Sequence, residues 1–257
     1  MVKLAANLTM MFNEHDFLDR FGAAAKAGFT AVEFLFPYAH PAERVAEELE
    51  RHGLDLALFN LPPGNWEAGE RGLACLPERA AEFEAGVATA MAYAAQLKPK
   101  RLHLMSGNGK RAEAAAVDSY RRSITIACAA AAPLGIDIVI EPINSRDMPA
   151  YFLNDFNFAA QLIGELGQPN LKLQYDIYHR QILHGDVLKS LAALMPIIGH
   201  VQIAAVPDRH EPGSGELDDG RILRALDTLG YAGYVGLEYR PAGDTVAGLA
   251  WRQRLGV

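Results

Sequence analysis

The sequence contains few cysteines: Cys75 and Cys128 are the only two among its 257 residues. They do not form a Cys-x-x-Cys pair of the kind that binds zinc, and two thiols do not make the disulfide framework of a small secreted domain. This usage is typical of a cytosolic protein whose thiols are reduced.

The sequence also lacks long apolar runs and an excess of positive charge. No uninterrupted apolar stretch approaches the roughly 18 residues that a membrane helix needs, and the first seven residues become polar too early for a secretion signal. The net charge of −7 argues against a nucleic-acid partner, because neutralising phosphates requires a basic surface. We therefore expect a soluble, cytoplasmic protein that binds neither membranes nor nucleic acid.

Glycine is missing from the turn after the first expected strand. A dinucleotide-binding fold needs a glycine-rich turn there, whereas residues 7–12 read NLTMMF. Strand-like and helix-like segments alternate eight times, which favours a single (β/α)8 TIM barrel domain over residues 1–257. The expected strands are 3–8, 31–36, 55–60, 101–106, 137–141, 172–176, 200–204 and 234–239. The expected helices are 14–27, 41–52, 77–97, 111–132, 155–166, 186–195, 220–229 and 245–254.

The expected loops differ in length at the two ends of the barrel. Connections from helix to strand are short, while three connections from strand to helix are long, at 61–76, 142–154 and 205–219. In an α/β barrel the strand-to-helix loops lie on the C-terminal face, where active sites are built. The long loops indicate a site on that face with a cover.

Four expected strands end in or near an oxygen-bearing side chain: Glu141, Asp176, Gln202 and Glu238. They belong to strands five to eight, which are neighbours in a barrel. Crowded carboxylates repel one another and resist burial, and a divalent cation relieves that repulsion. Because all four donors are oxygens, Mg²⁺ or Mn²⁺ is favoured over Zn²⁺. The alternative is a structural charge network without a metal.

Alternation along these strands indicates that the four side chains point into the barrel. The residues between them, such as Ile140 and Leu237, are apolar, as positions covered by helices must be. The inward set also contains four polar residues at lower levels, which we interpret as a buried network that shapes the barrel rather than as catalytic groups. These are Asp137, Lys172, Gln174 and His200.

Six stretches make the sequence resemble the hydroxypyruvate isomerase family of the xylose isomerase-like barrel superfamily, which includes 2-oxo-tetronate isomerases. They are RGLA at 71–74, IEPIN at 140–144, LQYDIYH at 173–179, HVQIA at 200–204, PDRHEPG at 207–213 and GLEY at 236–239. The resemblance covers essentially the full length. Glutamine at 202 is distinctive, because many sugar epimerases of the superfamily carry histidine there.

The resemblance implies that Glu141, Asp176, Gln202 and Glu238 bind Mg²⁺ or Mn²⁺, and that Glu141 and Glu238 are also the catalytic acid and base. The chemistry agrees, because moving a proton between adjacent carbons through a cis-enediolate needs an acid, a base and a means of stabilising charge. The implied substrate is a short hydroxy-oxo acid: hydroxypyruvate, which gives tartronate semialdehyde, or its four-carbon 2-oxo-tetronate homologue. The resemblance is also compatible with a homo-oligomer.

Four further residues are candidate substrate contacts, each with a structural alternative. His179 would face the site from the loop after strand six, or bond to backbone at a helix start. Arg209 would reach the substrate's oxygens, in keeping with the affinity of an arginine fork for carboxylate, or be a solvated loop cation. His103 would point into the barrel towards substrate or be structural. Trp66 would be a lid residue that excludes water, or an anchor for the loop 61–76.

Other functions are considered alongside this hypothesis. A sugar epimerase or isomerase of the same superfamily would turn over ketohexoses and would not need Arg209. A DNA-repair enzyme like endonuclease IV would need several histidine ligands for zinc and a basic groove, which the acidic balance and the oxygen donors do not favour. A binding protein without activity is not favoured either, because both candidate acid–base glutamates are present.

Overall fold

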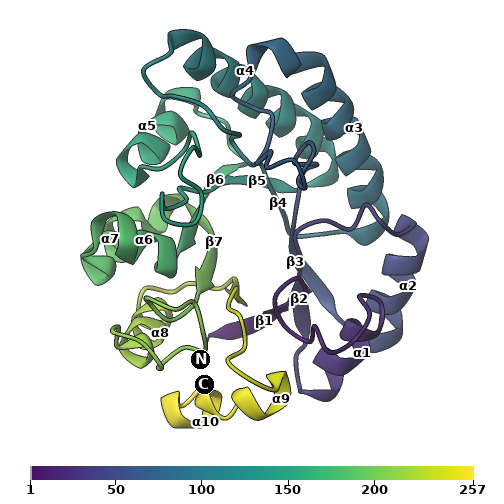
Figure 1. The fold of residues 1–257 in the computed structure, drawn as a ribbon, viewed down its shortest axis with the longest axis vertical. Coiled ribbons are helices and arrows are strands. Elements are labelled where there is room, and N and C mark those ends of the chain that lie inside the picture. The colour runs from purple at the N-terminus through teal and green to yellow at the C-terminus, as the bar shows by residue number, and fades with distance from the viewer. Residues whose placement is uncertain (1) are drawn as a thin grey trace.

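The computed structural model describes residues 2–257, in which eight parallel strands form a closed barrel. The helices lie outside the strands (Figure 1). Strand β1 pairs with β2 on one side and with β8 on the other, where Ala5 lies opposite Gly236. The expected TIM barrel is confirmed. The strands are β1 (Lys3–Asn7), β2 (Ala31–Glu33), β3 (Asp55–Asn60), β4 (Arg101–His103), β5 (Asp137–Ile140), β6 (Leu171–Asp176), β7 (Ile198–Ile203) and β8 (Tyr234–Leu237).

The helices follow the strands in the expected order, with three differences. The first begins at Asp19 rather than at residue 14, because Glu14 accepts a hydrogen bond from the backbone of Thr245 and holds the preceding segment in turns. The last is divided into two short helices, and one helix after β6 was not expected. The helices are α1 (Asp19–Lys26), α2 (Ala42–His52), α3 (Ala80–Leu97), α4 (Ala114–Ala131), α5 (Phe156–Leu166), α6 (Ile177–His184), α7 (Val187–Leu194), α8 (Asp219–Thr228), α9 (Thr245–Gly248) and α10 (Trp251–Leu255).

The unexpected helix α6 starts directly at the end of β6. The side chain of Asp176 accepts a hydrogen bond of 2.8 Å from the backbone nitrogen of Tyr178, which caps the helix. An aspartate at this position satisfies one of the free N–H groups that every helix start exposes. The strand end and the helix start therefore share one carboxylate, and the turn between them is minimal.

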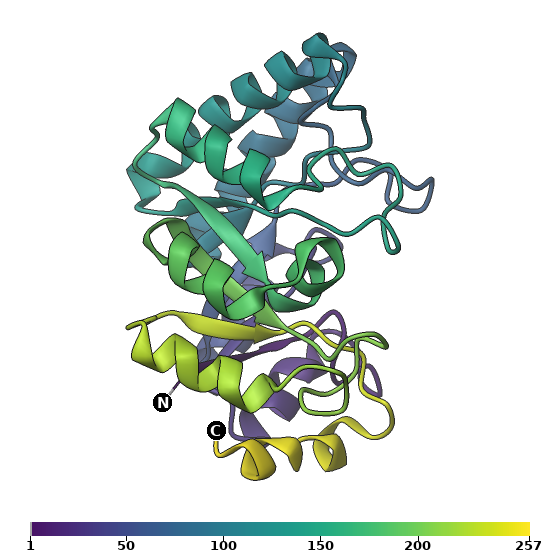
Figure 2. The ribbon, with the colours of Figure 1, turned by 90° about the vertical axis from the view of Figure 1, so that its left-hand side faces the viewer.

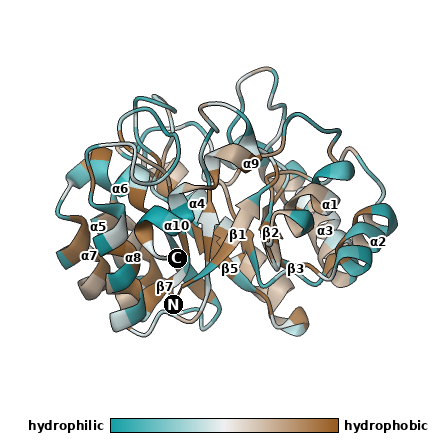
Figure 3. Cartoon of the chain, turned by 90° about the horizontal axis from the view of Figure 1, so that it is seen from below, coloured by the Kyte–Doolittle hydropathy of each residue, from teal (hydrophilic) through white to brown (hydrophobic). Residues whose placement is uncertain are grey.

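The covering helices bury one face and expose the other. In α2, Val45 and Leu49 are buried, and the helix ends at Gly53 in the left-handed conformation. Figure 3 shows that the strands are largely hydrophobic whereas much of α2 is hydrophilic. Within residues 2–257, none of the helices combines the length and apolar character needed to cross a bilayer.

The long strand-to-helix loops gather at one end of the barrel. In Figure 2 they lie on the right, the side towards which the strand arrows point, and the N-terminus lies on the opposite side. The loop after β3 is held to the segment that follows β4, where the backbone nitrogen of Gly107 donates to the carbonyl of Arg71 at 3.1 Å. The C-terminal face is therefore covered, as the loop lengths predict.

A chain of hydrogen bonds fills the barrel interior below this face, and Glu33 is its centre. One carboxylate oxygen of Glu33 accepts from Asn7 at 3.0 Å and from the amide of Gln202 at 2.8 Å, while the other lies 2.7 Å from Nε2 of His200. Gln174 donates to Gln202 at 2.6 Å. The interpretation as a buried network therefore holds for Gln174 and His200.

Gly236 on β8 leaves the space that Glu33 occupies. A Cβ atom at Gly236 would lie 2.2 Å from a carboxylate oxygen of Glu33, closer than atoms can approach. The Glu33 side chain is fully buried and hydrogen-bonded, so it has little room to move. Glycine is required at this strand position for packing, not for an unusual backbone angle.

Gly236→Ala is therefore expected to lower the free energy of unfolding by about 1–3 kcal/mol, the usual cost of overpacking a core. Urea denaturation measures the change. Gly164→Ala in α5 is the control, because a Cβ there meets no atom within 4 Å; alanine should leave stability unchanged or raise it by up to about 1 kcal/mol. Equal effects of the two substitutions would contradict the packing argument.

Candidate active site

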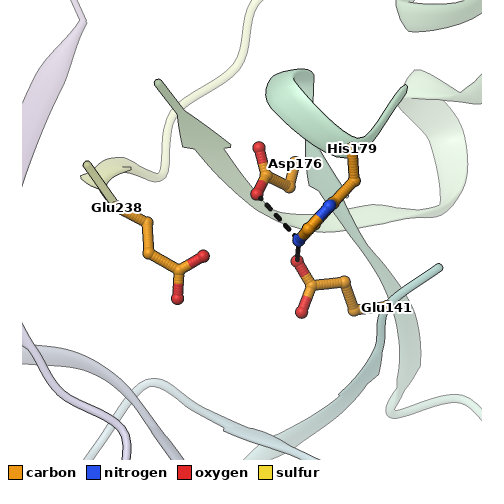
Figure 4. Close-up of side chains that lie close together, drawn as sticks. All are labelled: Glu141, Asp176, His179 and Glu238. Atoms are coloured by element: carbon orange, nitrogen blue, oxygen red, sulfur yellow. Dashed lines mark ion pairs between the residues drawn. The ribbon is translucent and has the colours of Figure 1, made fainter. Parts of the chain in front are cut away.

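Three carboxylates and one histidine meet where the strands end. Glu141 follows β5, Asp176 ends β6, Glu238 follows β8, and His179 lies in the first turn of α6. One ligand atom from each lies within 4.8 Å of those of the other three. Figure 4 shows His179 between Asp176 and Glu141, with Glu238 facing them. All four residues are buried.

Burial raises the pKa of all three carboxyl groups. The pKa of Asp176 is raised to about 6 and that of Glu238 to about 8. The pKa of Glu141 lies well above its usual value, because burial and the charges of Glu238 and Asp176 all disfavour its ionised form. A site in which carboxylates hold protons near neutral pH is suited to acid–base chemistry.

The cluster also has the character of a divalent-cation site. Oε1 of Glu141 and Oδ2 of Asp176 are buried and have no hydrogen-bond partner among residues 2–257. Buried carboxylate oxygens normally have a donor or a cation beside them. Oxygen donors of this kind suit Mg²⁺ or Mn²⁺, so the residues present fit the expected metal.

Arg209 supplies positive charge to the carboxylate cluster. Its Nη2 atom lies 2.5 Å from Oε2 of Glu238 and 3.5 Å from Oδ2 of Asp176, and its Nη1 atom lies 2.8 Å from Oδ2 of Asp147. Its guanidinium carbon lies 4.6 Å from the ring centre of Tyr178. Burial disfavours the charged guanidinium, but the surrounding carboxylates more than compensate and raise its pKa. Arg209 is a largely buried counter-ion, with 11% of its side chain exposed, rather than a solvated cation.

The orientation of His179 follows from Asn144. The side-chain oxygen of Asn144 accepts from the backbone N–H groups two and three residues later, so its amide nitrogen faces Nδ1 of His179 at 2.6 Å. Nδ1 therefore accepts, and the ring proton lies on Nε2, which is 3.5 Å from Asp176 and 3.9 Å from Glu141. Burial, then the positive charge of Arg209, lowers the pKa of His179 well below its usual value. The neutral ring is a hydrogen-bond donor into the site.

Gln202 lies beside Asp176 in the register of β6 and β7, but its amide is engaged below the cluster. Its oxygen accepts from Gln174 and its nitrogen donates to Glu33. The structure therefore brings together three of the four expected ligands and places His179 beside them as a hydrogen-bond donor. The role of Gln202 as a metal ligand stays a prediction, and it requires the amide oxygen to exchange its bond with Gln174 for one to the ion.

A cavity of about 240 Å³ opens above the carboxylates. All four candidate substrate contacts line it: Trp66, His103, His179 and Arg209. The full lining also contains Met10, Leu35, Asn60, Arg71, Met105, Glu141, Ile143, Asp147, Met148, Glu238 and Arg240. A larger hollow, of about 580 Å³, lies between α1 and α2 on the outside of the barrel, away from the strand ends and the carboxylates. The smaller cavity is the candidate active site, because Glu141, His179 and Glu238 line it.

Two of the candidate contacts differ in their surroundings. Nε2 of His103 lies 3.7 Å from Oε2 of Glu141, and burial lowers the pKa of this histidine to about 3, so it is neutral. Trp66 packs edge-on against Phe36 at 5.1 Å and lies beneath the guanidinium of Arg71 at 3.8 Å. Trp66 is therefore both anchored in its loop and exposed to the cavity.

The chain is similar to known proteins over nearly its whole length. The model of the xylose isomerase-like TIM barrel family matches residues 21–255. A 2-oxo-tetronate isomerase from Cupriavidus necator is 50% identical over 98% of this chain and 97% of its own. A hydroxypyruvate isomerase from Escherichia coli is 40% identical over 98% of both chains.

The chain belongs to the xylose isomerase-like TIM barrel family.

A solved structure of this family is similar over nearly its whole length. It is described as AP endonuclease, family 2 from Brucella melitensis, and it superposes with a TM-score of 0.97 at 44% identity over 99% of both chains. The two relatives above are isomerases, so the expectation of an enzyme resembling hydroxypyruvate isomerase is confirmed.

Three residues of the candidate site were not predicted from the sequence. Asn144 was quoted only as part of a motif, Asp147 was not considered, and Arg71 was not connected with the cavity. Each lies in a long strand-to-helix loop, where periodicity gives no orientation. The signal that could have found Arg71 is its place in RGLA, a motif specific to the resemblance.

Glu141→Gln is expected to stabilise the metal-free protein at pH 8 and to have little effect at pH 5. The pKa of Glu141 is raised above its unfolded value of about 4.3. Its contribution is therefore fully present below about pH 4 and is lost as the pH rises through the folded pKa. The neutral amide removes that loss, by on the order of 1.4 kcal/mol for each pKa unit relieved.

Urea denaturation in the presence of EDTA at the two pH values measures this difference. Glu67→Gln changes an exposed carboxylate in the loop after β3 and is the matched control, expected to leave both values unchanged. A Glu141→Gln protein that is equally destabilised at both pH values would show that Glu141 is not a strained carboxylate.

Proposed function

We propose that the protein interconverts a short 2-oxo acid bearing a hydroxyl group on C3 and the isomer whose carbonyl group lies at C3, which is an aldehyde when the substrate is hydroxypyruvate. The substrate is hydroxypyruvate or the four-carbon 2-oxo-tetronate. The observation that carries this proposal is the pair of buried carboxyl groups, Glu141 and Glu238, with raised pKa values beside one cavity. The names of the relatives, 2-oxo-tetronate isomerase and hydroxypyruvate isomerase, support the substrate class.

The proton transfers can be assigned to these two side chains. With hydroxypyruvate, one carboxylate removes a proton from C3, and the electron pair of that C–H bond moves to form the enediolate. The other carboxyl group then delivers a proton to C2, while a proton passes from the oxygen on C3 to the oxygen on C2. The product is tartronate semialdehyde. Glu141 and Glu238 exchange the two roles when the reaction runs backwards.

A divalent cation fits this site, with Glu141, Asp176 and Glu238 as ligands and Gln202 as the fourth. Mg²⁺ or Mn²⁺ held there would act as a Lewis acid that stabilises negative charge on the substrate's oxygens. The neutral Nε2–H of His179 supports the same charge as a hydrogen-bond donor. Arg209 holds Glu238 in place through its 2.5 Å contact and lines the cavity in which the substrate would lie.

The cavity walls exclude water from the reacting carbons. Met10, Leu35 and Ile143 are apolar members of the lining, and Trp66 joins them from the loop after β3. An enediolate that reaches bulk water picks up protons at random, so a dry site protects the intermediate. We propose Trp66 as part of this cover.

DNA cleavage is the second candidate, because the similar structure from Brucella melitensis is described as an AP endonuclease. A zinc site in such an enzyme would need several histidine ligands. The one cluster of potential ligands found in residues 2–257 contains a single histidine, which donates rather than accepts at Nε2. Together with the net charge of −7, this favours isomerisation over binding a polyanion. Tightly bound zinc found by metal analysis would favour the nuclease.

Glu141→Gln and Glu238→Gln are each expected to lower kcat at least about 100-fold, the usual worth of a positioned acid or base. Turnover of hydroxypyruvate and of 2-oxo-tetronate is followed by NMR in deuterium oxide, where the wild-type protein should place deuterium on the reacting carbon. Glu67→Gln is the control. Failure of the wild-type protein on both acids would contradict the proposed function.

Removal of divalent ions with EDTA is expected to abolish turnover, and Mg²⁺ or Mn²⁺ should restore it. The same ions should raise the melting temperature of the metal-free protein, because they relieve the repulsion among the three carboxylates. Calorimetric titration checks binding independently of turnover. Full activity of a protein shown by elemental analysis to be metal-free would contradict the assignment.

A further inference from the structure

Arg71, Arg209 and Arg240 line the cavity, and the first two differ in what their side chains contact. The guanidinium of Arg209 is paired with Glu238, Asp176 and Asp147, so its charge is already balanced by the protein. Arg71 makes no ion pair within residues 2–257; its side chain contacts two backbone carbonyls and the ring of Trp66. Arg71 is half-buried and lines the cavity, and its charge has no ion-pair partner among the described residues.

The position of Arg71 is fixed by the backbone around it. Its carbonyl accepts from Gly107 at 3.1 Å, and the nitrogen of Gly72 donates to Pro63 at 2.8 Å. Gly72 has φ +107°, and a Cβ there would lie 2.3 Å from the carbonyl oxygen of Met105. This close approach clamps the loop after β3 against the segment that follows β4.

The contacts of the guanidinium leave one edge free. Both hydrogens of Nη1 are used, by the carbonyls of Trp66 at 3.0 Å and Glu70 at 2.7 Å. The plane of the group is held 3.8 Å from the Trp66 ring centre. The Nε–Nη2 edge carries three N–H bonds that have no acceptor in the described residues. This edge has the geometry that binds a carboxylate with two parallel hydrogen bonds.

We propose that Arg71 binds the carboxylate of the substrate and selects acids over neutral ketoses. The inference rests on the proposed function and names the group that sets its substrate class. The carboxylate lies along the Nε–Nη2 edge, and the adjoining carbonyl and hydroxymethyl carbons extend towards Glu141 and Glu238 in the same cavity. Arg209, paired with the catalytic carboxylates, acts on the reacting end of the substrate.

The test compares Arg71→Met with the wild-type protein on two three-carbon substrates. Hydroxypyruvate carries the carboxylate, and dihydroxyacetone has a hydroxymethyl group in its place. Arg71→Met should lower kcat/KM for hydroxypyruvate about 100-fold, as expected when one partner of a charged pair is lost, and change kcat/KM for dihydroxyacetone little. Arg71→Lys keeps the charge but not the planar fork. Its kcat/KM for hydroxypyruvate should lie between those of the wild-type protein and of Arg71→Met.

Binding is measured separately from turnover. Calorimetry with glycerate, an acid that lacks the oxo group, should show a Kd that rises by a similar factor in Arg71→Met. Arg146→Met removes an exposed cation from the loop after β5, outside the cavity lining, and should leave both readouts unchanged.

Two results would overturn the assignment of Arg71. One is an unchanged kcat/KM for hydroxypyruvate together with an unchanged Kd for glycerate; the other is an equal loss on both substrates, which would indicate a structural role under Trp66. Absence of turnover in the wild-type protein would count against the proposed function instead, and the glycerate Kd alone would then decide the role of Arg71.

Discussion

Three carboxylates buried at the ends of β5, β6 and β8 are the constraint on which the rest of the site depends. Glu141, Asp176 and Glu238 repel one another and have lost their water, which raises the pKa of each. A protein keeps such a group together only where it is compensated. Arg209 provides part of that compensation, and the buried oxygens of Glu141 and Asp176 that have no hydrogen bond fit an additional cation.

The site is supported in layers. Beneath the carboxylates, Glu33 fills the barrel between Gly236 and His200 and holds Gln202 by its amide. At the level of the carboxylates, Asn144 fixes the ring proton of His179 on Nε2. Above them, the loop after β3 brings Trp66 and Arg71 to the cavity. In the proposed reaction, the lower layer orients the side chains of the site, the middle layer transfers protons, and the upper layer binds the acid and excludes water.

The carboxylates could be predicted from the sequence because they are tied to strand periodicity. A residue at the end of a buried parallel strand has its direction set by alternation, so Glu141, Asp176 and Glu238 were found together. The helix α6 was missed because its start is capped by Asp176, a residue already assigned to a strand. Arg71 and Asn144 lie in loops whose course depends on contacts distant in sequence, such as that of Gly72 with Met105.

Gln202 shows a different limit of sequence reasoning. Its position beside Asp176 follows from the barrel register. The direction of its amide depends on Glu33 in β2 and Gln174 in β6, which are distant from Gln202 in the sequence. Both donors and acceptors of an amide can face the site, and only the surrounding hydrogen bonds decide which one does.

The most direct test of the account is a crystal structure of the Mn²⁺-loaded protein with anomalous diffraction from the ion. The account predicts one Mn²⁺ peak bound by oxygens of Glu141, Asp176 and Glu238, with the oxygen of Gln202 turned to it and Nδ1 of His179 still bonded to Asn144. A peak coordinated by Nε2 of His179, or bound outside these carboxylates, would contradict it.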